Sequence, residues 1–465
     1  MPKANPSSVS PAPSPLHDVG SDTPRPTLVR FRMVALATGI AVMLYLHRVC
    51  ISPAGETIVE DLNIARDELD YVLGFFFWTY ALAQLPAGWL GDRYGARWML
   101  AAYLLLWSAT TGLMALAPSL SVLLILRMST GLFQAGAYPL AAGIVSRWIP
   151  VRSRGLASSF VAVGGRIGGA LAPLLTVQLM LLWTWEADWF ALPGDARAAA
   201  SSWRPVMAVY GGLGCLLALV FVWLFRDRPE QHAGVNADEL RLIREGDSAA
   251  RSTPKAKNLP PPIKALVSSE SMWMNCFVQF ATNLGWALLV TKLPQYLSET
   301  FQTTQQDQGW MQSLPLAAGI IGLLLGGVFT DTATRLLGRR RGRSVALVIS
   351  RLLTVAAFVA LPYCDSAISA TLLLSIVGFA TDLGTPAIWA YGQDVGGEFV
   401  GSVVGWGNMW GNFGAAVSPM FFTFVITRAP QDSGWEYAFL ACAAVNLLAA
   451  AAALRINAAV PLSRN

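Results

Sequence analysis

The chain carries few charged residues. Only 13% of its 465 residues are Asp, Glu, Lys or Arg, whereas an ordinary soluble domain has about 25%. Histidine is rarer still, with His17, His47 and His232 alone, and their spacing is not that of a zinc site. A Gly-rich phosphate loop ending in Lys-Ser or Lys-Thr is missing as well. Water is therefore not the main solvent of this protein, and we expect neither an enzyme nor an ATP-driven protein.

Closely spaced cysteines are also missing. The five cysteines are scattered through or beside apolar runs, which argues against a metal site or a disulfide framework and predicts small packing residues. They are Cys50, Cys215, Cys276, Cys364 and Cys442. We expect no metal and no cofactor. A nucleic-acid partner is not expected either, because the Lys and Arg residues behind the net charge of +5 lie in short loops between apolar runs.

Apolar runs fill most of the chain, in which 54% of the residues are hydrophobic. A helix needs roughly 20 apolar residues to span a hydrocarbon core, and the runs are about that long. They lie near 33–53, 71–91, 98–117, 121–146, 156–182, 205–225, 272–292, 308–330, 344–363, 366–391, 399–426 and 435–454. We predict an all-α membrane protein with twelve transmembrane helices in two sets of six.

Polar segments divide the chain into five predicted parts. The first residues are rich in Pro and Ser, and we expect a disordered tail there, with no cleavable signal peptide before the first span. The segment 236–244 has the pattern of a short amphipathic helix. The parts are a tail at 1–29, a bundle at 30–226, a linker at 227–270, a second bundle at 271–456 and a tail at 457–465.

Basic residues predict the orientation in the membrane. Lys and Arg gather at one side of the runs, which marks the cytoplasmic side, and the opposite loops are mostly acidic, as at Glu56, Glu60 and Asp61. The basic positions include Arg25, Arg30, Arg32, Arg93, Arg97, Arg147, Arg152, Arg154, Lys255, Lys257, Lys264, Arg335, Arg339, Arg340, Arg341, Arg343 and Arg455. Both termini, the linker and both tails are therefore predicted to be cytoplasmic. We expect a multi-pass protein of the plasma membrane, or of the inner membrane in a bacterium.

One short pattern occurs in both halves. The loop predicted after the second run contains Gly88, Asp92, Arg93, Gly95 and Arg97, and the loop after the eighth contains Asp331 before a basic cluster. Such an internal repeat is typical of secondary transporters. Asp92 can meet the positive end of a helix dipole from the other half, and Arg93 can pair with nearby carbonyls or acids. We expect a gate there; the alternative is an ordinary polar turn with a basic anchor.

These motifs resemble known families. The loop at 88–97 resembles the signature of the major facilitator superfamily. Further stretches resemble its anion:cation symporter family, which includes sugar-acid transporters, sialin and vesicular glutamate transporters: Tyr45-Leu46-His47-Arg48, Tyr80 with 84–88, 127–139, 228–232 with 236–243, 293–297 and 408–412. The resemblance covers most of the chain. It implies two pseudo-symmetric bundles with both termini cytoplasmic, and a monomer that carries a small organic anion by rocking of the halves around one midplane site.

Three arginines lie inside apolar runs, where each buried charge costs roughly 3 kcal/mol. They are Arg48, Arg127 and Arg166, and the clearest acid in the spans is Asp382. An anionic ligand can supply the missing negative charge, because a guanidinium binds a carboxylate in a bidentate way. The resemblance implies this role for Arg48 and Arg127. The alternative for each arginine is a bond to backbone carbonyls, and it weighs most for Arg166, which lies among glycines.

Amide side chains form two stripes at steps of four in the second half, which places each stripe on one helix face. The stripes are Asn275, Gln279 and Asn283, and Asn408 with Asn412. Facing a central cavity, they would bind hydroxyl groups, together with the phenols of Tyr80 and Tyr45; the alternative is contact between helices. With the resemblance, the stripes favour a hexuronate, aldonate or aldarate over a dicarboxylate, amino acid or phosphate.

The driving force is left open. Many proton-driven relatives have an acid just before the first of these arginines and another seven residues after the second, where this chain has His47 and Gln134. Histidine can carry a proton near neutral pH and glutamine cannot. Asp382 is a candidate for a replacement proton carrier or for the partner of an arginine, and both roles can hold, because a carboxylate released from arginine by substrate is free to take a proton. Proton symport, sodium symport and uncoupled uniport or exchange all remain possible, and a transporter-like receptor would have a similar sequence.

Overall fold

The computed structural model describes residues 25–190, 202–245, 260–303, 305–430 and 433–462. Most of the predicted tail at 1–29, part of the linker and the end of the tail at 457–465 lie outside these residues. The described residues contain helices and no β-strand. The prediction of an all-α protein is confirmed.

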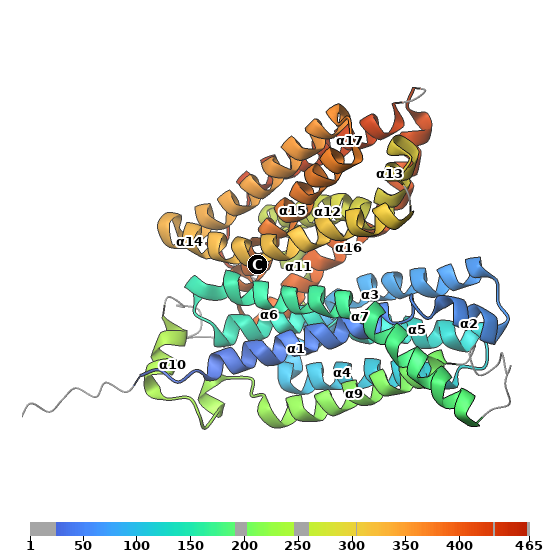
Figure 1. Cartoon of the computed structure of the whole chain (residues 1–465). Helices are drawn as coiled ribbons and strands as arrows, with labels where there is room; N and C mark the ends of the chain where they lie inside the picture. The colour runs from blue at the N-terminus through green and yellow to red at the C-terminus, as the bar shows by residue number, and fades with distance from the viewer. Residues whose placement is uncertain (1–24, 191–201, 246–259, 304, 431–432, 463–465) are drawn as a thin grey trace, which may run out of the picture.

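Two bundles of long helices make up the molecule (Figure 1). The first contains α1 (Val29–Val49), α2 (Gly55–Leu62), α3 (Arg66–Tyr94), α4 (Ala96–Leu113), α5 (Leu120–Gln134), α6 (Ala137–Trp148), α7 (Arg154–Phe190) and α9 (Trp203–Leu224). The second contains α12 (Glu270–Thr291), α13 (Leu293–Phe301), α14 (Gln305–Ala360), α15 (Ala367–Val395), α16 (Val400–Arg428) and α17 (Gly434–Leu454). The short helices α10 (Ala237–Arg244) and α11 (Ile263–Ser268) lie between them in the sequence.

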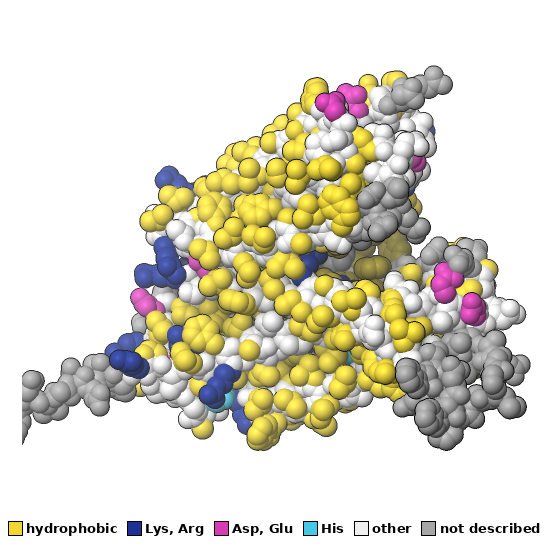
Figure 2. Space-filling model, in the orientation of Figure 1, with side chains coloured by type: hydrophobic (Ala, Val, Ile, Leu, Met, Phe, Trp, Pro, Cys, Tyr) yellow, Lys and Arg dark blue, Asp and Glu magenta, His cyan; other side chains and the backbone are white. Residues whose placement is uncertain are grey.

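The long helices suit a bilayer. Within the described residues, 9 helical segments are long and apolar enough to cross a membrane. One of them contains α14, whose two helical stretches meet at Gly338 (φ 76°), a backbone angle that a side chain would strain. Hydrophobic side chains cover much of the outer surface in Figure 2, and Leu219 and Trp223 of α9 are 67% and 75% exposed. The total of twelve spans stays a prediction.

The predicted loop after the second run is largely helical. Gly88, Asp92 and Arg93 lie in the last turns of α3, which continues to Tyr94. Gly95 alone interrupts the helix before α4 begins, with φ 93°. The loop predicted after the eighth run is likewise part of α14. These loop assignments were wrong, because both segments continue as helix and the helical backbone is interrupted at Gly95 and Gly338.

The run predicted at 121–146 forms one candidate span, Leu120–Trp148, with a break between the helices α5 and α6. The break between α5 and α6 lies at Ala135 and Gly136. Pro139 explains it, because proline has no N–H to donate to the carbonyl of Ala135 four residues earlier. The break lies directly after Gln134.

The helix α10 is fixed to the start of α1. Asn236 caps α10 by accepting a hydrogen bond from the backbone N–H of Glu239 at 2.9 Å. The buried Glu239 carboxylate in turn accepts hydrogen bonds from the Thr27 hydroxyl and from the backbone N–H of Arg30 at 3.1 Å, and pairs with the Arg30 guanidinium. The described part of the linker is therefore attached to the first bundle, and it contains the amphipathic helix expected at 236–244.

The two bundles converge toward the end that holds α10 and diverge toward α2 and α13 (Figure 1). Figure 2 shows the surface recessed between them at the divergent end. We call the convergent end, defined by Asp92, Asp331 and Asp394, the closed end. The middle of the molecule is marked by Tyr80, halfway along the 29 residues of α3.

Candidate functional site

Arg48 stands in the last turn of α1, surrounded by aromatic rings. Its guanidinium carbon lies 4.3 Å from the ring centre of Tyr80, 4.9 Å from that of Tyr45 and 5.2 Å from that of Phe76. Nε donates a hydrogen bond to Gln134 at 3.4 Å, while Nη2 is buried without a hydrogen bond. Among the described residues no carboxylate pairs with Arg48. Its positive charge is therefore supported by ring faces and left without an anion.

Arg127 supports the end of α1. It is 2% exposed and donates to the backbone carbonyls of His47 at 3.3 Å and Arg48 at 2.7 Å. Its guanidinium carbon also lies 4.3 Å from the ring centre of Phe76. These carbonyls are among the last of α1, which no residue of the helix itself can satisfy. The structure thus places Arg127 in the contact weighed as its alternative, and Arg127 positions the backbone that carries Arg48.

Arg166 and Asp382 join the two bundles. Nη2 of Arg166, on α7, donates to both carboxylate oxygens of Asp382, on α15, at 2.9 and 2.8 Å. The Arg166 side chain is 21% exposed and that of Asp382 7%. The ring of Trp286 lies 5.0 Å from the Arg166 guanidinium carbon. Of the two roles left open for Asp382, the structure shows the pairing with an arginine.

A fourth arginine of the interior was missed by the sequence analysis. Arg351, on α14, is 1% exposed and donates to Asn446 at 3.1 Å, to the Ser350 hydroxyl at 2.8 Å and to the Thr381 carbonyl at 3.2 Å. It also lies within electrostatic range of Asp382. The signal was available, because Arg351 lies within the apolar run at 344–363 just as Arg48 lies within 33–53.

His47 and Gln134 stand where proton-driven relatives have acids, and their side chains point in different directions. His47 is fully buried and its Nε2 lies 2.9 Å from the Tyr210 carbonyl of α9, so the ring faces the interior of the first bundle. Gln134 bridges Arg48 and α1, accepting from Arg48 and donating to the Leu44 carbonyl at 3.2 Å. Of these two residues, only Gln134 therefore contacts the guanidinium of Arg48.

The amides of α12 pack against glycines of α16. A Cβ built on Gly407 would lie 3.3 Å from Asn275 Nδ2 and closer still to Gln279 Nε2, and one built on Gly411 would lie 2.6 Å from Asn283 Nδ2. Asn275 and Gln279 are only 2% and 6% exposed. This stripe thus makes the interhelical contact that was its alternative, because glycine brings α16 against it.

The amides of α16 are more accessible. Asn408 donates to Gln84 of α3 at 3.0 Å, which links the two bundles, and Asn412 donates to the Asn408 carbonyl at 2.8 Å. The buried Gln84 Nε2 makes no hydrogen bond within the described residues. Tyr80, four residues before Gln84, stacks on Phe76 with ring centres 5.9 Å apart. Tyr80, Gln84 and Asn408 therefore form a polar edge beside Arg48.

Asp92 caps a helix of the other bundle. Its carboxylate accepts hydrogen bonds from the N–H groups of Gly401 at 2.8 Å and Ser402 at 2.7 Å, and from the Ser402 hydroxyl at 2.7 Å. Both residues lie in the first turn of α16, where unpaired N–H groups and the positive end of the dipole favour an anion. A Cβ on Gly88 would lie 2.5 Å from the Gly401 carbonyl carbon. Asp92 thus makes the contact described from the sequence.

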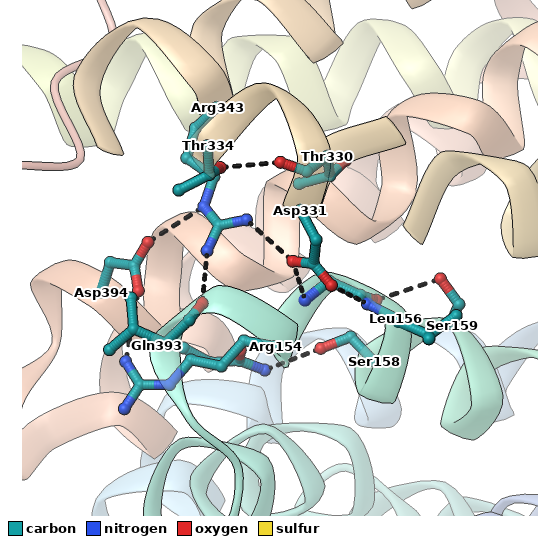
Figure 3. Close-up of polar contacts among 12 residues, drawn as sticks. Arg154, Leu156, Ser158, Ser159, Thr330, Asp331, Thr334, Arg343, Gln393 and Asp394 are labelled. Atoms are coloured by element: carbon teal, nitrogen blue, oxygen red, sulfur yellow. Dashed lines mark hydrogen bonds and ion pairs between the residues drawn. The ribbon is translucent and has the colours of Figure 1, made fainter. Parts of the chain in front are cut away.

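Asp331 makes the equivalent contact from the second bundle to the first. It lies on α14 of the second bundle and accepts from the N–H groups of Gly155 at 2.9 Å and Leu156 at 2.8 Å, in the first turn of α7 (Figure 3). Gly327 stands four residues before Asp331, as Gly88 stands four before Asp92, and its Cβ position lies 2.8 Å from the Leu156 Cα. Each bundle therefore caps one helix of the other. We call the two contacts the crossed caps.

Ion pairs extend the crossed caps (Figure 3). Asp394 is fully buried between Arg343 of its own bundle at 3.0 Å and Arg154 of the first bundle at 3.2 Å. Arg343 also lies 3.6 Å from Asp331. From the sequence, Arg154 and Arg343 were interpreted only as markers of membrane orientation, and Asp394 was not singled out. Asp394 lies three residues beyond the apolar run at 366–391, outside the segment in which charges were sought.

The remaining gate candidates act within the first bundle. Arg97 donates to the Val222 carbonyl of α9 at 3.1 and 2.8 Å, and its backbone N–H donates to Asp227 at 3.0 Å. A Cβ on Gly95 would lie 2.8 Å from the Asp227 carboxylate. The Arg93 guanidinium carbon lies 5.3 Å from the ring centres of Trp89 and Tyr94, its neighbours on α3. These contacts shape the turn that holds Asp92 in place.

Two helical bundles around an arginine-rich interior define a multi-pass membrane transporter rather than an enzyme. The family model of the Major Facilitator Superfamily matches residues 37–419 and 276–464, and the chain belongs to this family, as its signature motif predicted. It is therefore a protein of the plasma membrane, or of the inner membrane in a bacterium.

Individual relatives extend over most of the chain. The probable sulfoacetate transporter SauU of Cupriavidus necator is 30% identical over 418 residues, which are 89% of this chain and 90% of that protein. The probable galactarate/D-glucarate transporter GudP of Bacillus subtilis is 26% identical over 436 residues, 90% of each chain. The crystal structure of the fucose:proton symporter FucP of E. coli is 13% identical, covers 91% of this chain and 98% of its own, and has a TM-score of 0.66. This last likeness shows the fold.

Proposed function

We propose that this protein is a secondary transporter that moves a small organic anion across the membrane by alternating access. The observation that carries the proposal is Arg48, a cation in the middle of the molecule whose Nη2 is buried without a hydrogen bond. A buried unpaired charge is costly, and an anionic substrate removes the cost. The names of the similar transporters, for sulfoacetate and for galactarate and glucarate, support an organic acid as substrate.

The substrate class we propose is a sugar acid, bound by Arg48 and by the polar edge of Tyr80, Gln84 and Asn408. Tyr45 and Arg166 also belong to the proposed site, because the Tyr45 ring lies beside the Arg48 guanidinium and next to Gly165, the residue before Arg166. Asn275, Gln279 and Asn412 contribute by holding the packing between α12 and α16. Arg127 contributes by holding the end of α1, where its guanidinium donates a hydrogen bond to the Arg48 carbonyl at 2.7 Å.

The proposed topology has twelve spans in a monomer with both termini cytoplasmic. The 9 segments recognised by length and composition become twelve when α14 is counted as two spans and α3 and α12 are added. The divergent end would then open outward, and the crossed caps would close the cytoplasmic side. Opening the closed end requires that Asp92 and Asp331 release their helices, which makes both residues the gate of the proposed cycle.

Uptake of radiolabelled D-glucarate and sulfoacetate into proteoliposomes tests the proposal. We expect accumulation that Arg48→Gln abolishes and that Arg48→Lys retains in part, because lysine keeps the charge and loses the bidentate geometry. Binding without any accumulation would instead identify a receptor. Arg204→Gln is a matched control, since Arg204 pairs with Asp61 at 2.7 Å inside the first bundle, away from this site.

The coupling ion is tested in the same vesicles. Uptake is measured under an imposed pH gradient and then under a sodium gradient. His47 faces away from Arg48 and Gln134 holds no proton, so Asp382, which substrate can release from Arg166, is the candidate proton carrier that we propose. Stimulation by a pH gradient would support it, stimulation by sodium would establish sodium symport, and indifference to both gradients would leave uniport or exchange.

A further inference from the structure

The Arg166–Asp382 ion pair joins α7 of the first bundle to α15 of the second. One nitrogen of Arg166 contacts both oxygens of Asp382, at 2.9 and 2.8 Å, so the carboxylate is held by a single donor group. A guanidinium has five N–H donors, and the Arg166 side chain is 21% exposed, so part of it is not covered by the protein. An acid group can therefore approach Arg166 and compete with Asp382.

Arg48 and Arg166 border the same group of aromatic rings. The Tyr45 ring lies 4.9 Å from the Arg48 guanidinium carbon, and its Cε2 lies 2.8 Å from a Cβ placed on Gly165, the residue before Arg166. The ring of Tyr138 packs on Tyr45 with centres 6.4 Å apart and on Trp389 of the second bundle at 4.9 Å. Two cations thus stand near one group of aromatic rings, one without an anion and one with a carboxylate from the protein.

A second cation, Arg351, lies near Asp382. Arg351 belongs to the same bundle as Asp382, donates to the carbonyl of the preceding residue Thr381 at 3.2 Å, and lies within electrostatic range of the carboxylate. Gly319 of α14 leaves the room that Asp382 occupies, because a Cβ there would meet its Oδ2. A carboxylate displaced from Arg166 therefore keeps a positive charge nearby, which lowers the cost of displacement.

We propose that the site selects anions with two acidic groups, one bound by Arg48 and the other by Arg166, and that Asp382 occupies the position of the second acid in the empty transporter. This inference rests on the proposed function and narrows its substrate class to aldarates and other short dianions. An acid with one charged end satisfies Arg48, but its hydroxyl end is a weaker partner for Arg166 than the Asp382 carboxylate. Such an acid leaves the two bundles joined across the site.

Matched acids test the inference on the purified full-length protein. D-Glucarate and D-gluconate share one hydroxylated carbon chain and differ at one end, where glucarate has a second carboxylate and gluconate a hydroxyl. By isothermal titration calorimetry we expect glucarate to bind at least about 10-fold tighter than gluconate. Sulfoacetate and methanesulfonate form a second pair, for which the same preference for the dianion is expected.

Variants at the ion pair separate selectivity from folding. Arg166→Gln is expected to bring the affinity ratio of glucarate to gluconate to about 1, while Arg166→Lys keeps most of it, because the charge is retained. Asp382→Asn removes the competing carboxylate and is expected to tighten glucarate binding more than gluconate binding. Arg204→Gln, which breaks an ion pair elsewhere, should leave the ratio unchanged.

The outcomes are distinct. Equal binding of both acids by the unmodified protein, or an unchanged ratio in Arg166→Gln, would overturn the selection of dianions and leave the proposed function standing. A thermal unfolding curve of each variant checks that it is folded, and the ratio is independent of how much protein is active. Binding of neither acid pair would contradict the proposed function, and the selection with it.

Discussion

The closed end and the middle of the molecule treat charge in opposite ways. At the closed end, Asp92, Asp331 and Asp394 are each met by at least two donors, from helix N-termini or from arginines. In the middle, Arg48 has an unpaired nitrogen and Gln84 an unpaired amide. The difference separates two tasks. The carboxylates that hold the two bundles together at the closed end have their donors within the protein, whereas Arg48 keeps a buried donor that an anionic ligand can complete.

The largest expected effect is that of Arg48→Gln. Removing the cation should lower kcat/KM for anion uptake by about 100-fold or more, because the charge-assisted bonds to the substrate are lost. Thermal stability should change less, because glutamine still fits among the rings of Tyr45, Phe76 and Tyr80, and removing a buried charge without a paired anion offsets the lost ring contacts. Radiolabelled uptake and a thermal unfolding curve measure the two effects. A large fall in stability would mean that Arg48 belongs with the complete contacts of the closed end.

The next effect comes from the glycine beside a crossed cap. In Gly88→Ala the new Cβ would lie 2.5 Å from the Gly401 carbonyl carbon, so the bundles must separate there. We expect uptake to fall about 10-fold, from loss of the closed state. Gly74→Ala on the same helix is the control, because nothing lies within 4 Å of that position. Similar uptake by the two variants would show that the close approach at Gly88 is unimportant for transport.

Replacing the capping carboxylates should have a smaller effect. Asp92→Asn and Asp331→Asn each lose charge-assisted bonds to a helix N-terminus, worth about 1 to 2 kcal/mol, which shifts the population of the closed end by roughly 10-fold. Distances between spin labels at the ends of α3 and α16 would report the opening. Because each cap has two backbone N–H groups of a first helical turn donating to one carboxylate, the two variants should shift the distances by similar amounts. A shift in only one of them would disprove the equivalence.

The smallest expected effect is that of Asn275→Ala and Gln279→Ala. These amides pack on α16 instead of facing the substrate, so KM should change by no more than about threefold, while the free energy of unfolding falls by about 1 kcal/mol. Uptake kinetics and thermal unfolding measure both. A larger rise in KM with unchanged stability would move the stripe of α12 into the binding site.

The charge pattern of the sequence predicted much of the interior, because any charge inside an apolar run needs a partner. That reasoning found Arg48, Arg127, Arg166 and Asp382, and applied evenly it would have found Arg351. It could not say which arginine is paired. Arg127 binds carbonyls 79 and 80 positions earlier in the chain, and Arg166 binds an acid 216 positions later. Such partners follow from the packing of helices, which the spacing of residues along one helix does not contain.

Helical periodicity also left the direction of each stripe undetermined. Steps of four placed Asn275, Gln279 and Asn283 on one face of α12, as found. Which neighbour meets that face depends on Gly407 and Gly411 of α16, whose missing side chains let the helix come close. The same limit applies to His47: its neighbour Arg48 points to the site, and one step of about 100° around the helix turns His47 toward α9.

The crossed caps give the boundary between the bundles the character of a homodimer interface. In such an interface each partner presents the same patch, so that a residue on one side and its counterpart on the other make equivalent contacts. Here Asp92 and Gly88 meet the start of α16 as Asp331 and Gly327 meet the start of α7. The closed state is thus a self-complementary joint within a single chain, and every measurement on one of its sides has an internal replicate on the other.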